Sequence, residues 1–173
     1  AILLTGISAL PAWAMLGSGV FVATGSLPFT APQTPTLTLL PSGKVLVEGQ
    51  SGASGAARAA LYDPATGTWT ATGNPVAPRY YDSATLLKNG KVFVAGGNTN
   101  TSSSTTTINT TEMYDPATGT WSPGPNLLST RARHTATLLP NGKVLIAGGM
   151  TNYLDNSTAT NTTELYDPAT NTI

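Results

Sequence analysis

The stretch EMYDPATGTW at residues 112–121 occurs in three versions along this chain. An earlier version, ALYDPATGTW, lies at 60–69, and a later one, ELYDPATNTI, lies at 164–173. Their aspartates are separated by 52 residues in each step. A period of this length indicates a tandem repeat in which each unit is one small supersecondary structure.

A second shared stretch precedes each version of the first. It reads ATLLKNGKVFVAGG at 84–97 and ATLLPNGKVLIAGG at 136–149, and a degraded version, LTLLPSGKVLVEGQ, lies at 37–50. The Asn-Gly pairs predict a two-residue hairpin turn, because both residue types accept the positive φ angles that such a turn needs. The flanking aliphatic runs alternate little with polar residues, which predicts strands covered on both faces.

The stretch at 112–121 predicts a third strand, a turn and a fourth strand. Asp115 is expected to cap the turn, and Gly119 to take a left-handed conformation. Asn171 stands where the other versions have Gly, and Asn is the residue type that best tolerates this conformation after Gly. A four-stranded unit of about 50 residues predicts a β-propeller blade.

The two stretches resemble the kelch repeat, in which an arginine enters the first strand, a strand ends in Gly-Gly, and Tyr and Trp follow at fixed offsets. The resemblance covers roughly residues 18–173. It implies blades of four antiparallel strands that pack radially about a central channel. Blades of this type are similar to those of secreted bacterial and fungal propellers, including the galactose oxidase family.

We therefore expect an all-β fold, a propeller segment of about three kelch-type blades at about 36–72, 79–122 and 131–173. Residues 19–25 align with 67–73, which predicts one extra strand, the fourth strand of an earlier blade. A closed propeller has roughly four to eight blades, so a single chain is not expected to close a ring. The chain is then either a fragment of a longer protein or associates with other copies.

Residues 1–16 form an apolar N-terminal segment that precedes the partial propeller at 17–173. Its Ala-Trp-Ala triplet resembles a small-x-small cleavage site, which favours the remnant of a secretory signal. An edge strand of a preceding blade is the alternative. The segment is too short to span a bilayer.

Composition excludes several functions. Charged residues make up 9% of the chain and the formal net charge is zero, which argues against nucleic acid as a partner. There is no cysteine, so disulfides and thiolate metal sites are excluded. We expect no cofactor, no metal and no membrane span.

Two polar inserts, at 98–107 and 151–163, lie between second and third strands. We expect either a flexible uncharged loop or a sugar-bearing surface there. The candidate N-glycosylation sites are Asn100, Asn109, Asn156 and Asn161.

Charges that do not follow the repeat are the informative ones, and they include Glu48 and Asp82. Arginines recur 52 residues apart directly before first strands, where the entering loops of a propeller frame one mouth of the channel. This mouth is expected to bind a carboxylate, a sugar or a protein loop. The alternative is that these side chains pair with carbonyl and carboxylate groups between blades. The candidate binding residues are Arg79, Tyr80, Tyr81, Asp82, Arg131, Arg133 and His134.

These observations favour an extracellular binding or scaffold module that is secreted or lies at the cell surface. We expect it to carry glycans and to have no catalytic residues. Its expected partners are a protein or carbohydrate ligand and further copies or the remainder of a longer chain. The stretch at 78–85 also resembles the motif that places an active-site arginine in galactose oxidase-like enzymes. Those copper radical oxidases need two His ligands and a Tyr cross-linked to Cys, whereas this chain has one His and no Cys. The alternative is therefore a fragment of such an oxidase whose metal ligands lie outside this chain.

Overall fold

The protein is described by a computed structural model that places residues 23–30, 34–51, 55–100, 104–152 and 158–173. The apolar segment at 1–16 lies outside the described residues. So does most of the extra strand expected at 19–25, of which residues 23–25 are described without strand structure.

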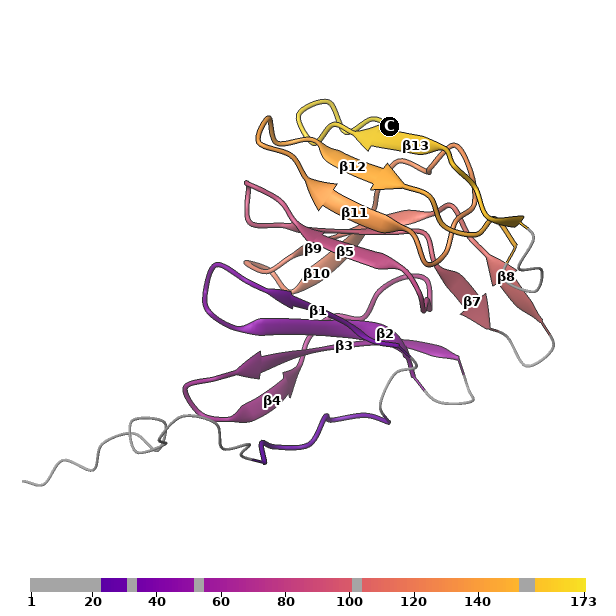
Figure 1. The fold of residues 1–173 in the computed structure, drawn as a ribbon. Helices are drawn as coiled ribbons and strands as arrows, with labels where there is room; N and C mark the ends of the chain where they lie inside the picture. The colour runs from indigo at the N-terminus through magenta and orange to yellow at the C-terminus, as the bar shows by residue number, and fades with distance from the viewer. Residues whose placement is uncertain (1–22, 31–33, 52–54, 101–103, 153–157) are drawn as a thin grey trace, which may run out of the picture.

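The described chain is all-β and forms three antiparallel sheets and one separate hairpin (Figure 1). Blade 1 has the strand order β1 (Thr36–Leu39), β2 (Val45–Ser51), β3 (Ala56–Asp63) and β4 (Thr68–Ala71). Blade 2 has the order β10 (Thr120–Pro123), β9 (Thr111–Asp115), β6 (Val92–Ala95) and β5 (Ser83–Leu86). Blade 3 contains β11 (Thr135–Leu138), β12 (Val144–Ala147) and β13 (Thr163–Tyr166), and the hairpin consists of β7 (Asn98–Asn100) and β8 (Thr105–Thr107). The expected fold, a partial propeller, is confirmed.

The first strands of the three blades lie side by side, because β5 contacts both β1 and β11. Each blade therefore has two ends along the direction of its strands. We call the edge where first strands begin, residues 34–36, 79–83 and 131–135, the entry edge. The opposite edge, formed by the turns that join β1 to β2, β3 to β4, β5 to β6, β9 to β10 and β11 to β12, is the turn edge (Figure 1).

Apolar side chains fill the space between neighbouring blades. Leu46 of blade 1 packs in one cluster with Val94 and Tyr114 of blade 2. Phe93 of blade 2 stacks on Tyr166 of blade 3, with ring centroids 4.0 Å apart. Blade 2 is thus covered on both faces, whereas blades 1 and 3 are each covered on the face that meets blade 2, which agrees with aliphatic strands that alternate little with polar residues.

The prediction of a two-residue Asn-Gly turn is wrong, because the turn has three residues. The N–H of Leu87 donates to the Lys91 carbonyl and that of Gly90 donates to the Leu87 carbonyl, so residues 88–90 form a three-residue loop. Only Gly90 has a positive φ, at 83°. Asn89 instead accepts the N–H of Lys91 through its side-chain oxygen. A type I turn closed by a left-handed glycine produces this geometry.

The turn after the third strand is as expected. Asp115 Oδ1 accepts the N–H of Ala117 at 2.9 Å, and Gly119 has a φ of 69°. Asn171 takes the same left-handed conformation, with a φ of 56°. Lys91 pairs with Asp115 at 3.0 Å, and this hydrogen bond, followed by that from Ala117, lowers the pKa of the aspartate.

The insert at 98–107, expected to be a loop, forms the β7–β8 hairpin in its described part. Threonine is β-branched and favours extended backbone, so a Thr-rich segment can form strands without an apolar face. The hairpin projects from the entry edge, where Asn98 bridges to Tyr80.

Residues 24–25 keep the repeat relation with blade 1. The N–H of Gly25 donates to the carbonyl of Gly67 at 3.0 Å, as that of Gly73 donates to Gly119 at 3.1 Å. Gly25 therefore contacts blade 1 as Gly73 contacts blade 2. Within the described part of the chain, no helix is long and apolar enough to cross a membrane.

Candidate functional site

Arg79, the first candidate residue of the entry edge, has no exposed surface. Its Nη1 donates to the carbonyls of Gly96 at 2.9 Å and Thr110 at 3.0 Å. Its Nη2 donates to Glu112 Oε1 at 2.6 Å. The guanidinium thus joins the end of the second strand to the third strand of its own blade.

Arg131 repeats this arrangement in blade 3. It is also fully buried, and it donates to the carbonyls of Gly148 at 2.8 Å and Thr162 at 3.3 Å. Its ion pair with Glu164 is 2.5 Å long. These contacts lie within one blade, whereas contacts between blades were expected as the alternative to ligand binding. Neither guanidinium is positioned to contact a ligand in solvent.

The glutamate of each pair also binds the linker between blades. Glu112 accepts the backbone N–H groups of Val76 at 2.7 Å and Ala77 at 2.9 Å. Glu164 accepts those of Leu128 at 2.7 Å and Ser129 at 3.2 Å. Each buried carboxylate is therefore satisfied by a cation and two amides, which is the condition for keeping a charge inside a protein.

Three residues that are not glycine adopt a left-handed backbone at equivalent positions of the entry edge. Thr34, Tyr81 and Arg133 have φ values of 46°, 57° and 56°. This conformation is disfavoured for side chains of this size, most of all for β-branched Thr. The N–H of Arg133 donates to the Tyr81 carbonyl at 2.8 Å, and that of Tyr81 lies 3.3 Å from Thr34 Oγ1. Strain of this kind clusters at ligand-binding positions.

Arg133 and Tyr81 form the part of the candidate set that reaches solvent. The guanidinium carbon of Arg133 lies 4.3 Å from the centroid of the Tyr81 ring, a cation–π contact that orients the charge. Arg133 is exposed, Tyr81 and Asp82 are half-buried, and Arg79, Tyr80, Arg131 and His134 are buried.

His134 of blade 3 is held by blade 2. Its Nε2 lies 2.8 Å from Ser83 Oγ, and a side chain at Gly96 would collide with the ring. Burial, followed by the charge of Arg131, lowers the pKa of His134 to about 4. The ring is therefore neutral at pH 7, and its role in this arrangement is to join two blades.

Asp82 faces Glu48 across the boundary between blades 1 and 2. Glu48 lies on β2, is buried, and accepts a hydrogen bond from Thr36 Oγ1. Burial raises the pKa of Glu48 well above its usual value, and the charge of Asp82 raises it further. Glu48 was not among the candidate site residues. The sequence does mark this position, because the equivalent residues of the other two blades, Ala95 and Ala147, are alanines.

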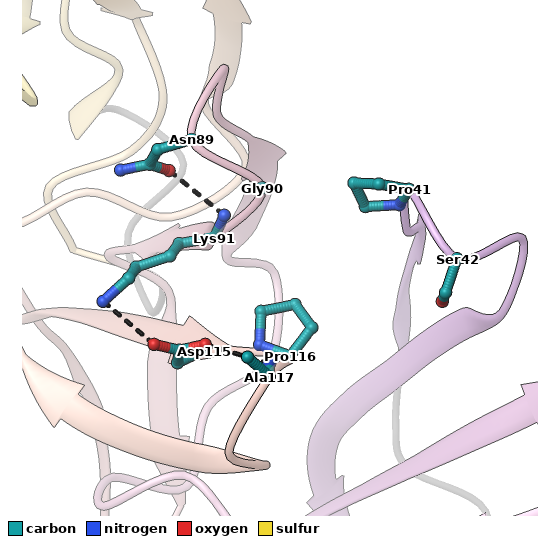
Figure 2. Close-up of a pocket in the computed structure, with 8 residues that line it drawn as sticks. All are labelled: Pro41, Ser42, Asn89, Gly90, Lys91, Asp115, Pro116 and Ala117. Carbon is teal, nitrogen blue, oxygen red and sulfur yellow. Dashed lines mark hydrogen bonds and ion pairs between the residues drawn. The ribbon is translucent and has the colours of Figure 1, made fainter.

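A cleft of about 500 Å³ lies at the turn edge between blades 1 and 2. Figure 2 shows Lys91 paired with Asp115 on one side and Pro41 on the other. In the equivalent cleft between blades 2 and 3, Lys88 hydrogen-bonds the Pro140 carbonyl, and the volume is about 260 Å³. Pro41 occupies the position of Lys88 in blade 1 and cannot make this bridge, so the first cleft is wider. The residues that line this cleft belong to the turns that recur in each blade.

The stacked antiparallel sheets, two of four strands and one of three in the described residues, together with the arginine-anchored entry edge, define a β-propeller segment. Residues 79–128 and 131–172 match the Kelch motif, which confirms the resemblance seen in the sequence. The chain belongs to the kelch-motif family.

Solved structures show the same fold. YjhT superposes with a TM-score of 0.66 at 21% identity, over 84% of this chain and 52% of YjhT. A fungal alcohol oxidase of the AA5 family, in complex with copper, superposes with a TM-score of 0.59 at 19% identity, over 83% of this chain and 30% of that enzyme. This chain therefore spans about half the length of YjhT.

Replacing Arg131 with Met tests the buried ion pair. The substitution leaves the Glu164 carboxylate buried without its cation, so we expect the free energy of unfolding to fall by about 3–5 kcal/mol. Urea denaturation followed by circular dichroism measures the change. Arg133→Asn is the control, because it removes a neighbouring exposed charge and is expected to change stability by less than about 0.5 kcal/mol. Equal stability of Arg131→Met and the wild type would contradict the assigned role.

The low pKa of His134 predicts acid sensitivity. Between pH 6.5 and 4 the unfolded chain binds a proton that the folded protein excludes, so the free energy of unfolding falls as the pH falls. The loss attributable to His134 is at most about 3 kcal/mol. It is measured as the difference between the wild type and His134→Gln across this range, because other groups cancel in the difference. Parallel stability curves for the two proteins would refute the prediction.

Proposed function

We propose that this chain is a recognition module that binds an anionic ligand, carried by a carbohydrate or a protein, at the entry edge. Kelch-type propellers generally mediate protein binding, which supports a binding role. The proposal depends on one observation within the repeat. Framework positions carry the same residues in successive blades, whereas the strained positions of the entry edge carry Thr34, Tyr81 and Arg133. Positions that differ in chemistry on a constant framework are suited to contact a specific ligand.

The chemistry of the exposed part indicates the ligand class. Arg133 presents an exposed guanidinium whose orientation is held by the Tyr81 ring. Guanidinium groups bind carboxylates through two parallel hydrogen bonds. The adjacent tyrosine ring offers an apolar surface of the kind that lines ligand sites. A carboxylate-bearing sugar or an acidic protein loop satisfies both groups.

The proposal is tested with an array of uronate-containing oligosaccharides and matched neutral oligosaccharides, together with acidic peptides. We expect binding to carboxylated probes that weakens as ionic strength rises. Arg133→Asn is expected to reduce affinity at least about tenfold, since a charge-assisted bond contributes about 1.5–3 kcal/mol. Asn tolerates the left-handed backbone, so the variant isolates the charge.

Lys88→Ala is the matched control, because it removes a positive charge at the turn edge. It is expected to bind as the wild type does. Binding that is unchanged in Arg133→Asn, or reduced equally in both variants, would exclude the entry edge as the recognition surface.

We also propose that the outer blade faces are covered by further kelch-type blades, supplied by a second copy or by the remainder of a longer chain. Leu37 and Leu39 of blade 1 are 62% and 64% exposed, and Leu165 of blade 3 is 40% exposed. Their equivalents Leu86 and Met113 in blade 2 pack against neighbouring blades. Exposed apolar sheet faces of repeat proteins promote association.

Light scattering after size-exclusion chromatography measures this association. For this chain expressed alone, we expect species larger than the 17.7 kDa monomer, with Leu39→Asp shifted toward the monomer. Leu128→Asp is the control, because Leu128 is 81% exposed in the linker between blades and not on a blade face. A monomeric wild type at high concentration would exclude self-association as the means of covering these faces.

An extracellular location and glycosylation form part of the same proposal. Asn161 is exposed, which suits an attached glycan, whereas the side-chain amide of Asn109 donates to the Leu127 carbonyl at 2.9 Å. Asn100 is half-buried and accepts a hydrogen bond from Thr105, and Asn156 lies outside the described residues. Asn161 is therefore the site we assign to a glycan.

The copper-oxidase alternative stays a prediction, because likeness to the fungal enzyme at 19% identity shows a shared fold alone. The sequence encoded by the full gene tests this alternative. A Cys, a Tyr-His pair and a further His elsewhere in the protein are required for the copper site that the resemblance implies.

A further inference from the structure

Two carboxylic acids face each other, removed from water, at the boundary between blades 1 and 2. Glu48 of β2 is 1% exposed, and its Oε2 is inaccessible, as are both carboxylate oxygens of Asp82. A side-chain hydrogen bond joins the two residues across the boundary. Because an ionised carboxylate only accepts hydrogen bonds, this bond exists only while one of the two acids carries a proton.

The surroundings of the pair assign this proton to Glu48. Thr36 Oγ1 donates to Glu48 Oε1, which leaves Oε2 as the oxygen that carries the proton and donates it to Asp82. A backbone hydrogen bond at Asp82 and the charge of Arg79 favour the ionised form of that residue. Burial, followed by the charge of Asp82, raises the pKa of Glu48 well above its usual value.

The charged groups on the neighbouring elements do not replace the proton. Arg79 acts electrostatically on both acids, but its two terminal nitrogens are occupied by Glu112 and by backbone carbonyls. Glu112 of β9 adds a further negative charge that acts on Asp82. Arg58, on the adjacent strand β3, donates to the Ala57 carbonyl. Ionising both buried acids would therefore leave two like charges facing each other, which is unfavourable.

The blade framework does not require acids at this place. At the equivalent boundary between blades 2 and 3, Ala95 and His134 occupy these positions, and His134 is joined to Ser83 by a hydrogen bond. The pair of acids is therefore a feature of the boundary between blades 1 and 2 and not of the repeat.

We propose that Glu48 and Asp82 form a proton-dependent clasp, in which one shared proton holds blade 1 to blade 2 and its loss weakens their boundary as the pH rises. The proton moves from Glu48 Oε2 to solvent, and the hydrogen bond across the boundary is lost with it. The unfolded chain releases this proton near the ordinary pKa of 4.5, whereas the folded protein retains it to higher pH. The stability that the clasp contributes is therefore complete at acid pH and declines as the pH rises.

The two boundaries of blade 2 then respond to pH in opposite directions. The boundary with blade 3 contains the neutral ring of His134 and is weakened by acid, because the unfolded chain binds a proton that the folded protein excludes. The boundary with blade 1 contains the clasp and is weakened by base.

Thermal unfolding of the wild type and of Glu48→Gln, from about pH 5 to about pH 8, tests the proposal. Glutamine has the shape of the protonated acid, so its amide can donate to Asp82 at every pH while its oxygen accepts from Thr36. We expect the Tm of Glu48→Gln relative to the wild type to rise by at least about 3 °C across this range. His134 and the other titrating groups cancel in this difference. A difference that stays constant would overturn the proposal.

The contribution of Asp82 is measured by repeating the comparison in an Asp82→Asn background. We expect the pH-dependent difference to shrink, because the second negative charge is absent. An undiminished difference would mean that Glu48 retains its proton through burial alone and that the two residues share none. Asp115→Asn is the control, because Asp115 has a lowered pKa and is ionised throughout this range. Its Tm is expected to follow the wild type in parallel.

Infrared spectroscopy locates the proton without depending on the stability of a variant. At about pH 7 we expect the wild type to show a carbonyl band of a protonated carboxylic acid, which Glu48→Gln lacks. Ordinary carboxylic acids are fully ionised at this pH, so they do not contribute to the band. A wild type without this band would show that both acids are ionised and would overturn the clasp.

Discussion

A buried guanidinium paired with a buried glutamate organises blades 2 and 3. Through Arg79, the segment that enters the first strand is tied to the end of the second strand and to the third strand of the same blade. Through Glu112, the same pair holds two amides of the linker that arrives from the preceding blade. Since both charges are withdrawn from water, neither is tolerated without the other. Blade 1 has Ala60 where the other blades have glutamate, so its third strand lacks this anchor.

The ion pair positions each sheet, and apolar packing then determines how the sheets stack. Every blade presents one apolar face to each neighbour, and these faces interdigitate in two clusters. Stability in such an array is a sum of blade and interface contributions, and the outermost faces need a cap or a further blade. The exposed leucines of blades 1 and 3 are the consequence of that rule in the described chain.

The two edges of the blades differ in what they repeat. The turn edge carries the same Lys–Asp ion pair and the same capped turn in each unit, as expected for a structural element. At the entry edge the buried arginine is constant between blades 2 and 3, but the residues that follow it change from Tyr81-Asp82 to Arg133-His134. The buried arginine belongs to the framework of each blade, whereas the residues that follow it differ in chemistry from blade to blade.

Much of the fold was predictable from the sequence because its signals are local. The left-handed positions of Gly119 and Asn171 and the capped Asp115 turn depend on hydrogen bonds between residues a few positions apart. The failed prediction of a two-residue Asn-Gly turn also has a local cause, because Asn89 accepts a hydrogen bond through its side chain and does not adopt a positive φ. The period of 52 residues then required similar units to stack.

The site was less predictable, because its contacts join residues that are distant in the sequence. The sequence placed Arg79 and Arg131 at the entry edge but left open whether they bind a ligand or the protein. Their burial follows from partners 33 residues away. The left-handed backbone at Thr34 has no signal in its residue type, and the partner of its hydroxyl, the N–H of Tyr81, lies 47 residues away in the sequence. The sequence alone therefore determined the repeat, its strands and most of its turns. Only the tertiary structure decided which charges are buried, paired or left facing each other, because burial and pairing depend on how separate blades meet.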